Sequence, residues 1–326
     1  MTNNMSKTKI ILISLFVMVI WGSLFALVKW DMIEFGISSK SNPFDVILFA
    51  GWRFLASGVI LVAFVLIKER KQHPIKTIFH SKKSLLAIVL VGLVGFGFHY
   101  SFTNLGLQTI DSGKASLIKQ AGVLIFICFS FLFFKEDKFT WQKLVGALLG
   151  AASIVVINLD SFQFAFTWEC LYLLGASFCT VIANVAFKKL VGEASPLSIT
   201  AFAMLFGGIV LTIVGYACGG KITNFTLTSV SILVGIIVAT VVSYGLWYNM
   251  VCRFELSKLF IIKMTEPLFA SLISFAIPAL NTKFSYELII AFALVGLAIY
   301  LSNAKFHKKK NKEELAYESH DCESGN

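Results

Sequence analysis

Charged side chains are scarce in this chain, since Asp, Glu, Lys and Arg make up only 14% of its 326 residues. Apolar residues make up 57%, and the mean hydropathy is +0.81. So little charge and so much apolar side chain exclude an ordinary soluble domain. The composition indicates a membrane protein.

Cysteine pairs and catalytic motifs are also missing. The six cysteines form no CxxC spacing and no paired set in the loops, so neither a disulfide framework nor a zinc site is expected. There is no Walker loop, no nucleophile elbow and no HExxH helix. We therefore expect no enzyme activity, no catalytic residue, no metal, no cofactor and no ATP-driven step on this chain.

Arginine is rare, with three residues against 25 lysines, a bias that hints at an AT-rich bacterial genome. The lysines follow the positive-inside rule, which predicts a bacterial inner or plasma membrane protein with both termini in the cytoplasm. The net charge of +10 is therefore a topology signal and not a sign of nucleic-acid binding, with contact to membrane lipid as a secondary effect. Five basic residues fall on the predicted outer flanks: Lys29, Lys40, Lys114, Lys221 and Lys283.

Long apolar runs recur along the chain, each long enough to cross about 30 Å of hydrocarbon as a helix. We expect ten spans, of which the fifth is the shortest. They cover about residues 10–28, 45–67, 84–105, 112–134, 142–158, 168–187, 197–217, 228–250, 256–278 and 286–304.

Four landmarks recur in the same order in the two halves of the chain, which indicates an internal duplication. Because each copy has five spans, the second copy enters the membrane from the opposite face, as in inverted-repeat carriers. The sequence therefore predicts an all-α polytopic membrane protein with ten transmembrane helices in two inverted five-helix repeats, residues 10–158 and 168–304, and a charged cytoplasmic tail, residues 305–326. The paired landmarks are Asn42-Pro43-Phe44 with Ser195-Pro196-Leu197, Tyr100 with Tyr244, Lys119 with Lys263, and Lys138-Phe-Thr-Trp-Gln142 with Lys283-Phe-Ser-Tyr-Glu287.

Lys119 and Lys263 lie inside apolar spans, at matching places in the two halves. A lysine at the centre of a membrane helix costs roughly 2.5–3.5 kcal/mol even on lenient scales, so it is usually found facing a polar cavity, a partner or a ligand. The two lysines bracket the predicted midplane, where a substrate carboxylate or phosphate could pass between them. Snorkelling, or structural pairing with Glu266, is the alternative reading.

Glu266 lies three residues after Lys263 and so shares its helix face. It is either a proton-coupling carboxylate or the salt partner of Lys263, and both readings stay open. Pro267 follows it and deprives the Lys263 carbonyl of its helical partner.

Other polar and aromatic side chains in the spans are expected in the same substrate site. For each of them a structural role is the alternative, a hydrogen-bonded core position for the histidine and packing for the tryptophans. They are Arg53, His99, Tyr100, Asn184, Tyr244, Trp21 and Trp247.

Several short motifs resemble EamA-type members of the drug/metabolite transporter superfamily, and they cover about residues 10–304. They are Val19-Ile-Trp21-Gly22-Ser23-Leu-Phe25, Arg53 within Gly51-Trp-Arg-Phe-Leu, Phe134-Lys-Glu136-Asp, Trp141-Gln-Lys-Leu-Val-Gly146 and Glu266-Pro267-Leu-Phe-Ala. The sequence departs from the family at Val123, where the first copy is expected to have a proline. The resemblance implies a ten-helix fold and metabolite transport, but no particular substrate.

Taken together, these features predict a secondary transporter of a small organic metabolite, anionic or zwitterionic, such as an amino acid or carboxylate. A cationic drug efflux carrier is the alternative within transport, and a membrane-embedded enzyme or assembly factor is the alternative class. A coupling proton, and a monomeric or homodimeric state, are left open.

Overall fold

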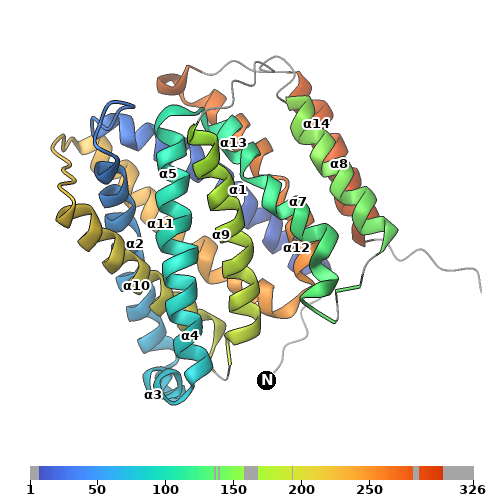
Figure 1. Cartoon of the computed structure of the whole chain (residues 1–326), viewed down its shortest axis with the longest axis horizontal. Helices are drawn as coiled ribbons and strands as arrows, with labels where there is room; N and C mark the ends of the chain where they lie inside the picture. The colour runs from blue at the N-terminus through green and yellow to red at the C-terminus, as the bar shows by residue number, and fades with distance from the viewer. Residues whose placement is uncertain are drawn as a thin grey trace, which may run out of the picture.

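The computed structural model describes residues 7–303 except 136, 139, 158–167, 193 and 282–285. Within that part of the chain all regular secondary structure is helical. Glu136, Lys283 and the expected tail of residues 305–326 lie outside the described residues. Figure 1 shows the helices gathered in a bundle, with α3 at its lower edge and α5 near the upper one.

The helices follow the expected spans closely, with a short break inside the fourth span and another inside the ninth. The elements are α1 (Lys7–Glu34), α2 (Pro43–Lys68), η1 (Arg70–Gln72), α3 (Pro74–His80), α4 (Lys82–Leu90), η2 (Val91–Phe98), α5 (His99–Thr109), α6 (Ser112–Ile118), α7 (Gln120–Phe129), η3 (Ser130–Leu132), α8 (Trp141–Ile157), α9 (Trp168–Leu190), α10 (Pro196–Ala217), α11 (Leu227–Arg253), α12 (Leu256–Lys263), α13 (Glu266–Ala276), η5 (Pro278–Leu280) and α14 (Glu287–Asn303).

Eight segments of the described chain are long and apolar enough to cross a membrane. The fifth and tenth expected spans correspond to α8 and α14, which have 17 residues each and pack against one another. The ten-span count therefore stays a prediction. The first span is longer than expected, because α1 continues to Glu34 and so takes in Asp31, a second acid inside a span besides Glu266.

The repeated Asn42-Pro43 and Ser195-Pro196 landmarks both begin helices. Asn42 accepts a hydrogen bond from the Phe44 N–H at the start of α2, and Ser195 accepts one from the Ser198 N–H at the start of α10. A side-chain oxygen here caps the free N–H groups, and proline fits the first turn because it has no N–H to lose. The two landmarks thus have the same structural role.

Glycines allow α2 and α10 to approach closely along an antiparallel seam. A Cβ on Gly58 would lie 2.5 Å from the Leu205 backbone, and one on Gly215 would lie 2.8 Å from that of Leu48. Small residues at such contacts are typical of membrane helix pairs. The seam continues at both ends, where Ser195 donates to the Glu69 carboxylate and the Lys221 N–H donates to Asp45.

The first helix of each half packs largely on the other half of the chain. Helix α1 contacts α11, α12 and α13, while α9 contacts α5, α7 and the π-helical segment η2. Because the two halves exchange their first helices in this way, side chains from both halves meet at the centre of the bundle.

Candidate functional site

A cavity lined by side chains of both halves lies at the centre of the bundle. All ten residues expected in a substrate site line this one cavity: Trp21, Arg53, His99, Tyr100, Lys119, Asn184, Tyr244, Trp247, Lys263 and Glu266. Sequence reasoning missed several further wall residues. They include Phe25, Thr103, Asn104 and Thr180.

Helical spacing could have found three of the missed residues. Thr103 lies four residues after His99, Asn104 lies four after Tyr100, and Thr180 lies four before Asn184. Residues four apart share a helix face, so each of these positions follows from an expected neighbour.

Both cavity lysines lie at breaks in their spans. Lys119 separates α6 from α7, and Lys263 ends α12, with two residues between it and the start of α13. In the second half Pro267 lies in the first turn of α13 and has no N–H for the Lys263 carbonyl. The proline at this place therefore accounts for that break.

The first half reaches the same break without a proline. The Ser177 hydroxyl of α9 donates to the Lys119 carbonyl over 2.5 Å and accepts from the Gly122 N–H over 2.7 Å. A side chain inserted into the hydrogen-bond ladder in this way interrupts a helix. Gly122 makes room for it, because a Cβ there would lie 2.7 Å from the Ser177 hydroxyl. Ser177 thus interrupts the helix at Lys119, as Pro267 interrupts the helix at Lys263.

The two lysines differ in their partners. Lys263 forms an ion pair with Glu266, and its Nζ lies 4.4 Å from the centroid of the Trp21 ring. Lys119 Nζ lies 4.6 Å from the centroid of the Phe25 ring. In the described part of the chain it has no ion pair or hydrogen bond. Of the two readings of Glu266, the geometry supports pairing with Lys263.

Arg53 also lacks an acidic partner among the described residues. Its Nε donates to the Thr240 hydroxyl over 2.9 Å, and its Nη2 has no hydrogen-bond partner there. The guanidinium carbon lies 4.8 Å from the centroid of the Phe54 ring and 5.1 Å from that of Tyr100. Aromatic faces attract such a cation, but they leave donors free for an anion.

Aromatic rings form much of the cavity wall. The repeat-related Tyr100 and Tyr244 share a hydrogen bond between their hydroxyls. The Trp21 ring centroid lies 5.2 Å from that of Tyr244 and 4.9 Å from that of Trp247. The paired tyrosines are 144 residues apart, the same separation as Lys119 and Lys263.

Two expected site residues are held by structural hydrogen bonds. His99 Nδ1 lies 3.1 Å from the Gly95 carbonyl, and its Nε2 lies 3.3 Å from the Thr180 hydroxyl. Asn184 accepts from the Trp247 indole N–H over 2.8 Å and donates to the Thr180 carbonyl. Both side chains are positioned by these bonds at the cavity wall.

Some buried polar atoms at the wall have no partner among the described residues. They are Trp21 Nε1, Arg53 Nη2 and both amide atoms of Asn104. Buried polar groups are nearly always hydrogen-bonded, so unpaired ones facing a cavity are available to a ligand or water. The wall therefore offers three donors and one acceptor besides the Lys119 ammonium.

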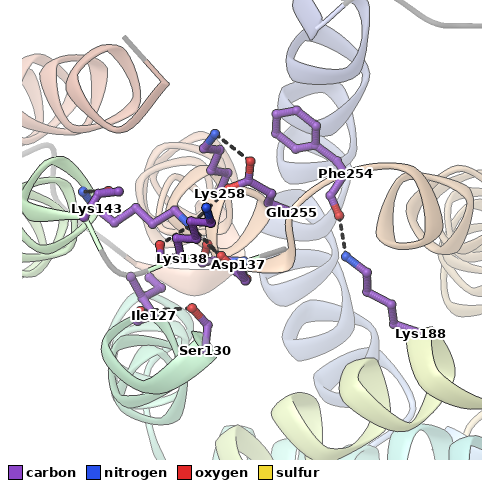
Figure 2. Close-up of polar contacts among 11 residues, drawn as sticks. Ile127, Ser130, Asp137, Lys138, Lys143, Lys188, Phe254, Glu255 and Lys258 are labelled. Carbon is purple, nitrogen blue, oxygen red and sulfur yellow. Dashed lines mark hydrogen bonds and ion pairs between the residues drawn. The ribbon is translucent and has the colours of Figure 1, made fainter. Parts of the chain in front are cut away.

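The broken spans are tethered in the same way where they begin. Lys29 of α1 donates to the Ile110 carbonyl over 2.6 Å, just before α6. Lys188 of α9 donates to the Phe254 carbonyl over 2.8 Å, just before α12 (Figure 2). Ile110 and Phe254 are again 144 residues apart. We call these two regions the Lys29 end and the Lys188 end of the cavity.

The Lys188 end carries an additional buried network. Lys143 Nζ lies 2.5 Å from Asp137 and 3.0 Å from Glu255, and Lys258 lies 2.9 Å from Glu255 (Figure 2). Asp137 is fully buried and also accepts from the Ser257 N–H over 3.1 Å and from the Ser257 hydroxyl. Partial burial acts to raise the pKa of Glu255, but hydrogen bonds from Lys258 and Lys143 outweigh it and lower that pKa.

The EamA-like transporter family matches residues 8–159 and again residues 167–304. This chain belongs to the EamA-like transporter family. It is therefore a multi-pass membrane protein of a family of transporters, as the sequence motifs predicted. The second match begins close to the start of α9 at Trp168.

Several similar proteins are named as transporters. The chain is 29% identical over 206 residues to the uncharacterized inner membrane transporter YedA of Escherichia coli K12, covering 63% of this chain and 64% of YedA, which is less than two thirds of that protein. It is 28% identical over 203 residues to the S-adenosylmethionine/S-adenosylhomocysteine transporter of Chlamydia muridarum, covering 59% of this chain and 58% of that protein.

One relative matches over most of its length, and one solved structure shares the fold. The uncharacterized transporter YyaM of Bacillus subtilis is 23% identical over 307 residues, covering 90% of this chain and 94% of YyaM. A crystal structure superposes with a TM-score of 0.71 over 91% of this chain and 98% of the other, at 16% identity. At that identity the likeness shows the fold alone.

Proposed function

We propose that this chain is a secondary transporter of a small organic metabolite with a negatively charged group, anionic or zwitterionic, such as an amino acid or carboxylate. The observation that carries the proposal is the Lys119 ammonium, which faces the cavity without an acidic partner while Lys263 is paired with Glu266. Two unpaired cations, Lys119 and Arg53, leave the cavity with a net positive charge that favours an anionic group.

The mechanism we propose is alternating access between two inverted five-helix repeats, residues 10–158 and 168–304. Support comes from contacts that recur at a separation of 144 residues. The tethers at Ile110 and Phe254 and the breaks at Lys119 and Lys263 all follow that rule. Tyr100 and Tyr244 are also 144 residues apart, and the hydrogen bond between their hydroxyls links the two halves of the chain. Inverted repeats of this kind suit a central site that is exposed to each side in turn.

We also propose that the Lys188 end faces the cytoplasm of a bacterial cell, with both termini on that side. The Ser84 hydroxyl donates to the Val191 carbonyl, which lies just beyond Lys188. The basic segment that precedes Ser84 therefore lies at this end, as positive-inside topology requires. That segment holds Lys68, Arg70, Lys71, Lys76, Lys82 and Lys83.

A zwitterionic substrate fits the wall as well as a simple anion does. The Chlamydia muridarum relative is named for S-adenosylmethionine and S-adenosylhomocysteine, molecules that each carry a carboxylate and an amino group. The aromatic rings of Trp21 and Trp247 offer faces to a flat or cationic group. Efflux of a purely cationic drug fits less well, because the one acid at the cavity wall is paired with Lys263.

A solute screen tests this proposal. Purified protein is heated with single amino acids, short carboxylates, S-adenosylmethionine and the cationic dye ethidium, and ligands that bind the folded state raise its Tm. Hits are then tested for counterflow in proteoliposomes. We expect a carboxylate-bearing solute to raise the Tm and to exchange, and Lys119→Met to lose both effects while Lys114→Met keeps them. Stabilisation and exchange by ethidium alone would contradict the proposal.

A further inference from the structure

Asp31 is a buried acid that does not line the cavity. It lies in the last turns of α1 and is fully buried. Neither carboxylate oxygen has a hydrogen-bond partner in the described part of the chain. The other two buried acids there, Asp137 and Glu266, each form an ion pair. Asp31 therefore differs from both, because no described residue forms an ion pair or hydrogen bond with its carboxylate.

Asp31 continues the stripe of α1 that faces the cavity. Trp21, Leu24 and Val28 line the cavity, and Asp31 follows Val28 by three residues. Steps of three and four residues keep to one helix face. Asp31 thus lies on the same face, about 4.5 Å beyond Val28 along the axis, toward the Lys29 end.

Charged groups around Asp31 are engaged elsewhere. Lys29 bonds to the Ile110 carbonyl and lies 3.7 Å from Asp111, while Glu34, one turn beyond Asp31, accepts from Trp30. Asp45 of α2 accepts from the Lys221 N–H. The helices packed on α1 carry six further charged or histidine side chains, none of which bonds to Asp31: His99, Lys114, Arg253, Lys258, Lys263 and Glu266.

A carboxylate that is removed from water without a partner is strongly disfavoured in its charged form, whereas the protonated acid is tolerated much better. We propose that Asp31 is a proton-binding site that holds a proton while its carboxyl group is buried, as it is here, and loses that proton when the Lys29 end opens to water. One proton passes from solution to a carboxylate oxygen of Asp31 as the end closes. The inference rests on the proposed alternating access.

Cysteine labelling tests the site without knowledge of the substrate. Leu107 lines the cavity near this end and is buried, so its reaction with a membrane-impermeant maleimide reports opening. In a full-length protein without native cysteines, Leu107→Cys is labelled in proteoliposomes at several pH values. The rate is divided by that of exposed Lys40→Cys, which corrects for the pH dependence of the thiol itself.

We expect the ratio to rise with pH when Asp31 is present, by at most about tenfold per pH unit, the limit for linkage to one proton. Asp31→Asn, which mimics the protonated acid, should give a low and flat ratio, and so should Asp31→Ser if the first variant fails to fold. Glu34→Gln, at the neighbouring acid, should keep the wild-type slope. A flat ratio in the parent protein, or an unchanged slope in the Asp31 variants, would overturn the proposal.

This outcome is separable from that of the transporter proposal. If no solute exchanges in proteoliposomes, the transporter proposal fails, while the labelling ratio still reports whether Asp31 binds a proton. If exchange is found and the ratio does not depend on Asp31, the transporter proposal stands and the proton site is refuted.

Discussion

The two broken spans, α6–α7 and α12–α13, occupy matching places in the two halves and yet hold their lysines differently. In α12–α13 the break is made by Pro267 and the Lys263 charge is neutralised by Glu266 three residues away. In α6–α7 the break is made by a hydroxyl from another helix, and Lys119 Nζ lies over the Phe25 ring, with no ion pair or hydrogen bond to a described residue. Lys263 thus has its ion-pair partner in its own span, whereas Lys119 has none there and its ammonium group faces the cavity.

The starts of the two broken spans also differ in their polar contacts, which are more numerous at α12 than at α6. Both are tethered by a lysine to a carbonyl, at Ile110 and at Phe254. Beyond that tether, α6 begins beside Asp111, which is 64% exposed, whereas α12 begins on the buried Asp137 network. The two halves therefore share the position of the break and of the tether but differ in the charged partners around them.

The largest expected effect is the loss of transport in Lys119→Met. A hydrogen bond to a charged group is worth about 1.5–3 kcal/mol, so transport should fall by roughly ten- to a hundredfold. Because Lys119 forms no ion pair with any described residue, the Tm should not fall. Counterflow and thermal unfolding measure both quantities, with Lys114→Met as the matched control. A large fall in Tm would show that Lys119 has a structural role.

Lys263→Met should differ from Lys119→Met in that it lowers the stability of the protein, measured as Tm. Removing one partner of a buried pair leaves an uncompensated charge and costs about 3–5 kcal/mol. The double variant Lys263→Met with Glu266→Gln should recover much of that loss, because the two sites are coupled neighbours. The comparison of Tm values among the single and double variants decides the point. Additive losses would refute the ion pair and reopen a coupling role for Glu266.

Ser177→Ala should alter the first break at a smaller cost. It removes two hydrogen bonds at Lys119 and Gly122, each worth about 0.5–1.5 kcal/mol, and lets α6 and α7 form a more continuous helix. Adding Val123→Pro should restore the break, because a proline there has no N–H for the Lys119 carbonyl, as Pro267 has none for the Lys263 carbonyl. Part of the lost transport should return with it. If Ser177→Ala transports at the wild-type rate, the hydroxyl is not what shapes the site.

The smallest expected effect concerns Glu255 at the start of α12. Its pKa is lowered in the folded protein, so its contribution to stability is present above the unfolded pKa and is lost as the pH falls through the folded pKa. Glu255 is 30% exposed, and solvent screening holds this contribution to below about 1 kcal/mol. Unfolding curves of wild type and Glu255→Gln should differ at neutral pH and converge in acid. A constant difference at all pH values would contradict this.

The ten residues expected in the site line one cavity, and their role in binding a substrate stays a prediction. Lys119 and Lys263 were singled out as charges inside apolar spans at matching places in the two halves, and Glu266 as an acid three residues after Lys263. Helical spacing would have added Thr103 and Asn104. These features depend on local sequence and on the duplication, and both can be read along a single chain.

Other features depend on contacts between distant segments. Ser177 interrupts the helix between α6 and α7 only because α9 packs against it. The sequence around Val123, which lacks a proline, therefore did not predict a break made by Ser177. The expected first span ends at residue 28, whereas α1 continues to Glu34 and so includes Asp31. Which lysine is paired also needed the three-dimensional arrangement, since the spacing left both readings of Glu266 open.

The most direct test of the account compares ligand binding by two variants. A carboxylate-bearing solute that raises the Tm of wild type is titrated against Lys119→Met and against the double variant Lys263→Met with Glu266→Gln. If Lys119 supplies the cation that binds the ligand, the first variant should show no ligand-dependent rise in Tm and the second should keep one. Binding retained by Lys119→Met and lost in the double variant would contradict the account.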